Sequence, residues 1–224
     1  MKKVKIYGDS ILKGVMYNDE LKRYKLFGYR YETLKANGIE VENNCKMGAT
    51  IDEGLEIMKS TLTDCDEDTL VILEYGGNDC NFNWAAVAEN PNGEFEPNTP
   101  KDKFTDTYLK LVEYARGKGA RVAICTLVPI DSTRFMNWVS RGLNYDNILH
   151  WLGDIERISR WQEGYSKLSE KVAQITNCAI LDLRSVFSGS MGSLLGIDGM
   201  HPSPEGHTII LDAFQKKLLE SPTL

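Results

Sequence analysis

The sequence has little of what a disulfide scaffold or a metal enzyme needs. Its five cysteines are odd in number, form no CxxC pair and include two in apolar runs, "VAICTL" and "NCAILDL". This usage is typical of reduced cysteines that pack as small apolar side chains. The three histidines form no HExxH motif and no Cys/His pair, so a metal-dependent hydrolase is disfavoured, although loss of activity in a chelator would favour it again. We therefore predict no metal and no other cofactor.

An excess of basic charge and a membrane-length apolar run are also absent. The formal net charge is -6 at pH 7 and no basic stripe offsets it, so a nucleic-acid partner is not expected. The basic amino terminus is followed by only a short apolar stretch, interrupted by Lys5, which predicts neither a signal peptide nor a membrane span. We therefore expect a cytoplasmic protein without a membrane partner. Secretion without a cleavable signal and the oligomeric state stay open.

Length and composition favour one globular domain over residues 1–224. A chain of this size buries roughly 70–75% of its unfolded surface, which is enough for one core without covalent staples. Two connections, at about 80–102 and 129–154, are too long to be simple turns, and long ordered loops are usually functional. Trp84, Trp138 and Trp151 lie in them and are candidates for substrate contacts. For Trp138 and Trp151, packing is an equally good interpretation.

Apolar, β-branched runs alternate with helical patterns along the chain. The predicted strands are Val4–Tyr7, Ile39–Asn43, Thr69–Tyr75, Arg121–Leu127 and Ala179–Leu183. The predicted helices are about Glu20–Ala36, Ile51–Thr61, Phe104–Lys118, Ile155–Ile175 and Pro204–Glu220. Continuous apolar strands joined by helices indicate an α/β fold with a doubly wound, five-stranded parallel sheet. Trp161 and His207 fall in helical patterns and are assigned to packing.

Small and polar residues follow several of these strands at their carboxyl ends. Gly8-Asp9-Ser10 follows the first strand, and Gly76-Gly77-Asn78-Asp79 follows the third. In an open parallel sheet, ligands bind beyond the carboxyl ends, at the point where the winding reverses. In the flavodoxin-like strand order 2-1-3-4-5, Ser10 and Asn78 would flank one crevice at that point.

A serine hydroxyl needs a base to become a nucleophile, and His201 is the best candidate. Asp198 lies three residues earlier across a turn, so its carboxylate can hold Nδ1 of His201 while Nε2 faces Ser10. Acyl transfer also needs donors for a developing oxyanion, which the Asn78 amide and the backbone N–H groups of Gly48 and Ser10 can supply. Taken singly, each residue fits a turn or a helix cap. Turn chemistry does not require the whole set, and this favours catalysis.

Four blocks of the sequence resemble the SGNH (GDSL-type) serine hydrolases. Ser10 lies in "YGDSI", Gly48 in "NCKMGAT", Asn78 in "GGND", and Asp198 and His201 in "DGMHPSPEGH". The resemblance extends from residue 7 to residue 207, with an isoleucine where the family name has a leucine. It implies a three-layer α/β/α fold, a Ser-His-Asp triad of Ser10, His201 and Asp198, and an oxyanion hole formed by Ser10, Gly48 and Asn78.

The resemblance also implies a carboxylic ester hydrolase that works through an acyl-enzyme. We favour a small-molecule ester with a short acyl group, such as an acetyl ester of a carbohydrate. A lysophospholipase or thioesterase and an aryl esterase of the same family are alternatives. Outside the family, a non-catalytic ligand-binding flavodoxin-like domain stays open. Ser10 to Lys13 also matches the S-x-x-K pattern of penicillin-recognising enzymes, but the S-D-N and K-T-G partners are missing.

Overall fold

Five parallel strands form the centre of the structure, a computed structural model that describes residues 1–189 and 191–221. The strands are β1 (Lys3–Gly8), β4 (Glu40–Asn43), β5 (Thr69–Glu74), β6 (Arg121–Cys125) and β7 (Ala179–Leu181). They lie in the order β4-β1-β5-β6-β7, and every neighbouring pair is parallel. This confirms the predicted sheet and its strand order. All six residues of β5 are buried, as expected for a strand covered on both faces.

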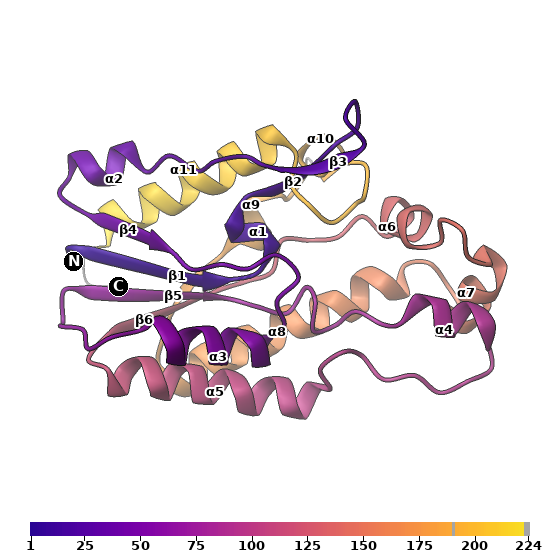
Figure 1. Cartoon of the computed structure of the whole chain (residues 1–224), viewed down its shortest axis with the longest axis horizontal. Coiled ribbons are helices and arrows are strands. Elements are labelled where there is room, and N and C mark those ends of the chain that lie inside the picture. Colours follow the sequence, from indigo (N-terminus) through magenta and orange to yellow (C-terminus); the bar gives the residue numbers. More distant parts are fainter. Residues whose placement is uncertain (190, 222–224) are drawn as a thin grey trace.

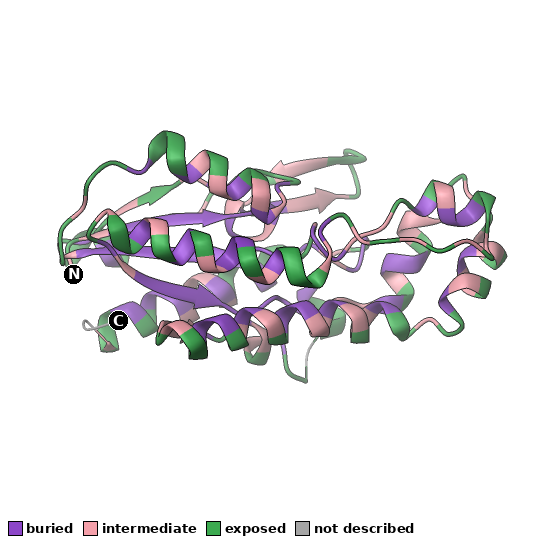
Figure 2. Ribbon diagram, turned by 90° about the horizontal axis from the view of Figure 1, so that it is seen from below, coloured by how far each residue is buried: buried purple, intermediate pink, exposed green. Residues whose placement is uncertain are grey.

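Helices cover both faces of the sheet (Figure 1). One face carries α3 (Ile51–Thr61), α5 (Lys101–Gly117) and α8 (Arg157–Thr176), and the other carries α2 (Glu32–Ala36), α9 (Leu183–Val186) and α11 (Pro204–Glu220). Successive residues of a strand point to opposite faces. Val71 and Leu73 of β5 accordingly join the core under α5 and α8, whereas Leu70 and Ile72 join the core under α11. The outer helices are buried on the side that faces the sheet and exposed on the other (Figure 2).

The prediction of one helix over Glu20–Ala36 is wrong. The structure has a short helix α1 (Ser10–Lys13), then an antiparallel hairpin of β2 (Val15–Asn18) and β3 (Arg23–Leu26), and helix only in α2. Tyr17 and Tyr24 pair across the hairpin, and both pack edge-on against Trp138, with ring centroids 4.5 and 6.3 Å away. Contacts with a distant part of the chain therefore outweigh the local helical pattern.

The two long connections are helical in part, which the sequence did not predict. They contain α4 (Trp84–Glu89), α6 (Ser132–Val139) and α7 (Tyr145–Leu152), which lie beyond the carboxyl ends of the strands (Figure 1). The side chains of Asn83, Asp131 and Asn144 each accept a backbone N–H at the start of one helix. These helices and the start of α8 share an apolar cluster, here called the outer cluster, of Trp84, Val87, Ala88, Phe135, Met136, Ile148, Leu152 and Ile158.

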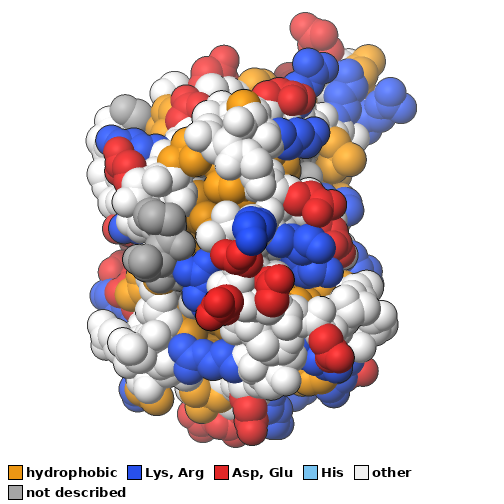
Figure 3. Space-filling view, turned by 90° about the vertical axis from the view of Figure 1, so that its left-hand side faces the viewer, with side chains coloured by type: hydrophobic (Ala, Val, Ile, Leu, Met, Phe, Trp, Pro, Cys, Tyr) orange, Lys and Arg blue, Asp and Glu red, His pale blue; other side chains and the backbone are white. Residues whose placement is uncertain are grey.

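The end of the molecule where the strands begin, opposite α4, α6 and α7, carries charges of both signs. Figure 3 shows this face, where Lys and Arg side chains lie among Asp and Glu side chains. Near the amino ends of the strands, Lys2 pairs with Asp68 at 2.7 Å and Lys118 pairs with Asp64 at 3.1 Å. Within residues 1–189 and 191–221, no helix has the length and apolarity to cross a membrane.

Candidate active site

Ser10 lies where β1 meets α1, on a turn that depends on Gly8 and on the capping side chain of Asp9. A Cβ at Gly8 would lie 2.9 Å from the carbonyl oxygen of Glu74, so no side chain fits there. The next residue, Asp9, accepts the N–H of Ile11 at 2.9 Å and thereby caps α1. Ser10 is the first residue of this helix and is 7% exposed. The turn therefore fixes the serine at the carboxyl edge of the sheet.

His201 and Asp198 lie together on the loop before α11. Nδ1 of His201 lies 2.7 Å from Oδ2 of Asp198, and Nε2 lies 3.0 Å from Oγ of Ser10. Gly199 makes the turn between them, with φ +70° and with a Cβ position only 2.6 Å from the backbone nitrogen of Phe135. All three side chains of the proposed triad are buried, and Asp198 is fully so.

The carboxylate of Asp198 is stabilised in its charged form. Its Oδ1 accepts the backbone N–H groups of His201 at 3.0 Å and of Met200 at 3.2 Å. Burial alone would raise the pKa of Asp198, but the hydrogen bond and charge of His201 and these two amides outweigh it. The pKa therefore lies below its usual value. Asp198 can hold the imidazole by Nδ1–H and balance a positive charge on it.

The three predicted oxyanion donors lie beside Ser10, but they are not equally free. Within the described part of the chain, the backbone N–H groups of Ser10 and Gly48 donate to no acceptor. Gly48 has φ +78°, a conformation that favours glycine. The Asn78 amide nitrogen instead lies 3.1 Å from both Oδ2 of Asp9 and the carbonyl oxygen of Ala49. An oxyanion would therefore compete with these acceptors for Asn78.

Two buried acids, Asp9 and Glu74, lie near Ser10 at the carboxyl edge of the sheet. The sequence did not suggest a role for Glu74. Asp9 and Glu74 are each 1% exposed, and Oε2 of Glu74 has no hydrogen-bond partner among the described residues. Burial raises the pKa of Glu74 well above its usual value, and the charge and hydrogen bond of Asp9 raise it further. Burial raises the pKa of Asp9 as well, but the hydrogen bonds from Ile11 N–H and the Asn78 amide offset part of that rise. The environment therefore favours the proton on Glu74 more strongly than on Asp9. The signal was a single acid near the end of the apolar run "TLVILEY".

A cavity of about 150 Å³ opens next to the serine. Ser10, His201, Asn78 and Gly48 line it on one side, and Trp84 is part of its wall. Trp161, which the sequence assigned to the core, also lines the cavity. A helical pattern identifies an apolar face, but it does not tell a cavity wall from a filled core.

The other two candidate tryptophans do not line this cavity. Trp138 packs against the hairpin, and the guanidinium of Arg141 lies 3.6 Å from the centre of its ring. Trp151 packs edge-on against Phe82, and its indole N–H donates to the carbonyl oxygen of Gly93 at 3.2 Å. The hairpin itself supplies a neighbour that the sequence did not reveal, because the ring of Tyr24 lies 5.2 Å from the imidazole of His201.

Three solved structures share this fold over nearly the whole chain. The lipase/acylhydrolase from Enterococcus faecalis is 17% identical, with a TM-score of 0.63 over 97% of this chain and 95% of that one. The putative acylhydrolase from Bacteroides fragilis is 19% identical, with a TM-score of 0.63 over 98% and 88% of the two chains. The acetylxylan esterase from Geobacillus stearothermophilus is 19% identical, with a TM-score of 0.66 over 97% and 94%.

Comparison of the sequence with curated proteins gives no match. A family model gives a clear result, because the GDSL-like Lipase/Acylhydrolase family matches residues 6–209. This range contains every block that carried the predicted resemblance. The chain belongs to the GDSL-like lipase/acylhydrolase family of carboxylic ester hydrolases.

Proposed function

We propose that this ester hydrolase uses Ser10 as nucleophile, His201 as base and Asp198 as the acid that orients and stabilises the imidazole. The observation that carries the proposal is the unbroken chain of contacts from Ser10 Oγ to His201 Nε2 at 3.0 Å and from His201 Nδ1 to Asp198 Oδ2 at 2.7 Å. His201 takes the hydroxyl proton as Oγ bonds to the ester carbonyl carbon. The bond between the carbonyl carbon and the alkoxy oxygen then breaks, and the protonated imidazole gives its proton to the departing alkoxide. The alcohol leaves, and the acyl group stays on Oγ of Ser10.

Water completes the cycle by the same steps. His201 removes a proton from the water, the hydroxide attacks the acyl carbon, and Ser10 leaves with the proton returned by His201. The carboxylic acid is released. In both halves the negative carbonyl oxygen is stabilised by the N–H groups of Ser10 and Gly48, together with the Asn78 amide once it turns from Ala49.

The finer identity of the ester is a separate proposal. The sequence favours a short acyl ester such as an acetylated carbohydrate, and the fold shared with an acetylxylan esterase supports it. Lysophospholipid, thioester and aryl ester substrates are the alternatives within the family. The cavity beside Ser10 instead favours a longer acyl group than acetyl. A cytoplasmic location stays a prediction.

Labelling and turnover of a Ser10→Ala variant test the mechanism. A fluorophosphonate probe should label the wild-type protein on the peptide that contains Ser10 and should leave Ser10→Ala unlabelled. Hydrolysis of 4-nitrophenyl butyrate by the variant should fall to the residual acceleration of a binding site, roughly 10³–10⁴ over water. Ser60→Ala, an exposed serine on α3, is the matched control and should behave like the wild type. Wild-type turnover in Ser10→Ala would refute the proposal.

A further inference from the structure

The cavity joins the Ser10–His201 pair to the outer cluster. Its walls include Trp84, Phe135 and Ile158 of that cluster, together with Phe82 and Trp161. These side chains come from the segments after β5 and β6 and from the first turns of α8. The carbonyl group bonded to Ser10 therefore has an apolar, largely aromatic space on one side.

The polar groups of Trp84, Trp161 and Gln162 in this wall are already used inside the protein. The indole N–H of Trp84 donates to Oδ1 of Asn81 at 2.7 Å, and that of Trp161 donates to the Cys80 carbonyl oxygen at 3.0 Å. Gln162 donates to the carbonyl oxygen of Val128 at 2.8 Å and accepts from Arg184 at 2.9 Å. These groups are not available to the hydroxyls of a sugar. A buried hydroxyl without a partner is unfavourable, whereas a buried methylene is favourable.

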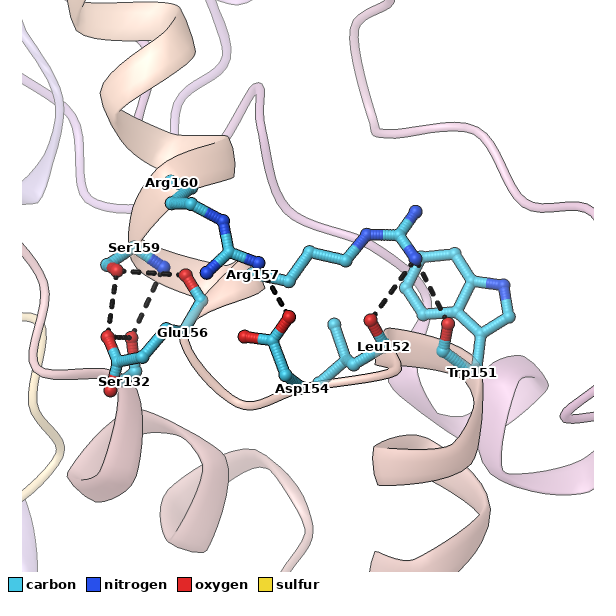
Figure 4. Close-up of polar contacts among 8 residues, drawn as sticks. All are labelled: Ser132, Trp151, Leu152, Asp154, Glu156, Arg157, Ser159 and Arg160. Carbon is cyan, nitrogen blue, oxygen red and sulfur yellow. Dashed lines mark hydrogen bonds and ion pairs between the residues drawn. The ribbon is translucent and has the colours of Figure 1, made fainter.

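Polar contacts hold the start of α8 against α6 and α7 (Figure 4), and Ile158 in this part of α8 lines the cavity. The guanidinium of Arg157 donates to the carbonyl oxygens of Trp151 at 3.1 Å and Leu152 at 3.3 Å. On the other side of the same turn, Ser132 of α6 accepts the backbone N–H of Ser159 at 3.2 Å. Ile158 lies between these contacts. This part of the wall is therefore already ordered, and a bound chain would not have to order it.

The size of the cavity limits the length of the chain that can enter. Its volume is about 150 Å³, while a single water needs roughly 10–15 Å³ in such a measure and an apolar cavity of about 150 Å³ can hold benzene. An acetyl methyl group would leave most of this space unfilled, and a dodecanoyl chain would exceed it.

We infer that the cavity is an acyl-chain site for linear, unsubstituted acyl groups of medium length, about that of hexanoyl. The inference rests on the proposed function, because it requires the acyl carbon to be bonded to Ser10. Filling the aromatic space with methylenes stabilises the transition state in proportion to the apolar area buried, until the space is full.

The test is a series of 4-nitrophenyl esters from acetate through butyrate, hexanoate and octanoate to dodecanoate. We expect kcat/KM to rise about fourfold per added methylene up to hexanoate or octanoate and to be lower for dodecanoate. A highest value for acetate, a continuous rise to dodecanoate, or faster hydrolysis of acetylated xylooligosaccharides than of the hexanoate would each overturn the inference. If Ser10→Ala abolishes hydrolysis while acetate is the best ester, only the inference fails and the proposed function stands.

Two phenylalanines provide a matched pair of variants. Phe82 and Phe95 are both half-buried, and both pack edge-on against Trp151, at 5.0 and 5.7 Å, but only Phe82 lines the cavity. Phe82→Ala should lower the ratio of kcat/KM for hexanoate over butyrate by about tenfold and should move the best ester to a longer chain. Phe95→Ala should leave that ratio at the wild-type value. An equal change in both variants would overturn the inference, and the wild-type series decides it even if a variant is poorly folded.

Discussion

His201 and His207 are close in sequence and both buried, but their surroundings differ in one chemical respect. His201 faces a carboxylate, Asp198, through Nδ1. His207 lies beneath the hairpin, where Nε2 is 3.0 Å from the Val15 carbonyl oxygen and Nδ1 is 2.7 Å from the Tyr29 hydroxyl. Since a carbonyl oxygen only accepts, Nε2 of His207 carries the hydrogen. Nδ1 accepts from the Tyr29 hydroxyl, which lies nearer to it than to its other acceptor, the Ile11 carbonyl oxygen at 3.3 Å. His207 is thus held as a neutral imidazole.

The difference indicates why His201, and not His207, is the proposed base. Burial lowers the pKa of His207 to about 4, and the partial charge of the Val15 carbonyl offsets only part of the effect. Near neutral pH such an imidazole has no tendency to accept a proton. His201 can accept one because the charge it gains lies next to Asp198. The two buried histidines therefore differ in the group that Nδ1 contacts, which is a carboxylate for His201 and a hydroxyl for His207, and not in how deeply they are buried.

The strongest test of this difference between the two histidines is to replace each with glutamine. His201→Gln should lower kcat for 4-nitrophenyl butyrate by at least ~10⁴-fold, because among the described residues His201 is the base that lies within hydrogen-bond distance of Ser10 Oγ. His207→Gln should keep kcat within about threefold, since its ring touches no part of the site's hydrogen-bond chain. Circular dichroism checks that both variants are folded. A large loss of kcat in folded His207→Gln would show that the two sites are not separate.

The oxyanion that forms in the reaction needs hydrogen-bond donors, and replacement of Asn78 tests whether its amide is one of them. Asn78→Ala should reduce kcat about 10²–10³-fold with little change in KM, because the amide acts on the transition state. Asn92→Ala removes an exposed amide whose only described partner is His150, and it should leave kcat unchanged. If Asn78→Ala keeps its kcat, then the backbone N–H groups of Ser10 and Gly48 hold the oxyanion alone and Asn78 serves to anchor Asp9 and Ala49.

The strands, and the residues at their ends, are the part of the structure that the sequence predicted well. Buried parallel strands read as continuous apolar runs, and the winding rules place their carboxyl ends at one edge. Ser10, Asn78 and His201 therefore converge although they are far apart in sequence. Their catalytic roles stay predictions until the variants are measured.

What the sequence could not predict depends on contacts between distant segments. Tyr17 and Tyr24 of the hairpin pack against Trp138, and no local sequence pattern predicts this contact between distant segments. The cavity wall mixes residues from three separate segments, and an apolar side chain looks the same in sequence whether it fills a core or faces a substrate. For Glu74, the sequence showed only that an acid ends a strand that is buried on both faces, which is unusual but does not identify its partner.

The smallest expected effect concerns stability rather than turnover, and it follows from the neutral state of His207. The pKa of His207 is about 4 when folded, against an ordinary value near ~6.5 for an unfolded chain. As the pH falls below ~6.5, the unfolded chain binds a proton before the folded one does. The contribution of His207 to stability is therefore complete above ~6.5 and decreases toward pH 4, by up to roughly 3 kcal/mol. Tyr29 and the charge of His201 are the titratable neighbours.

Asp79 provides a control of opposite sign. Burial raises its pKa to about 6, only partly offset by hydrogen bonds from Thr99 and the Ile51 amide, and the charges of Asp9 and Asp52 add to the rise. Here the folded chain binds the proton first, so stability increases as the pH falls from about 6 toward ~4, by roughly 3 kcal/mol. The free energy of unfolding in urea is measured for the wild type, His207→Gln and Asp79→Asn at pH 7, 5.5 and 4.5. Subtracting the wild-type value at each pH removes the contributions of the other titrating groups and leaves those of His207 and Asp79. Relative to the wild type, His207→Gln should gain stability on acidification and Asp79→Asn should lose it. If the free energy of unfolding changed with pH in the same way in all three proteins, neither His207 nor Asp79 would have a shifted pKa in the folded protein. The contrast between His207 and His201 would then fail.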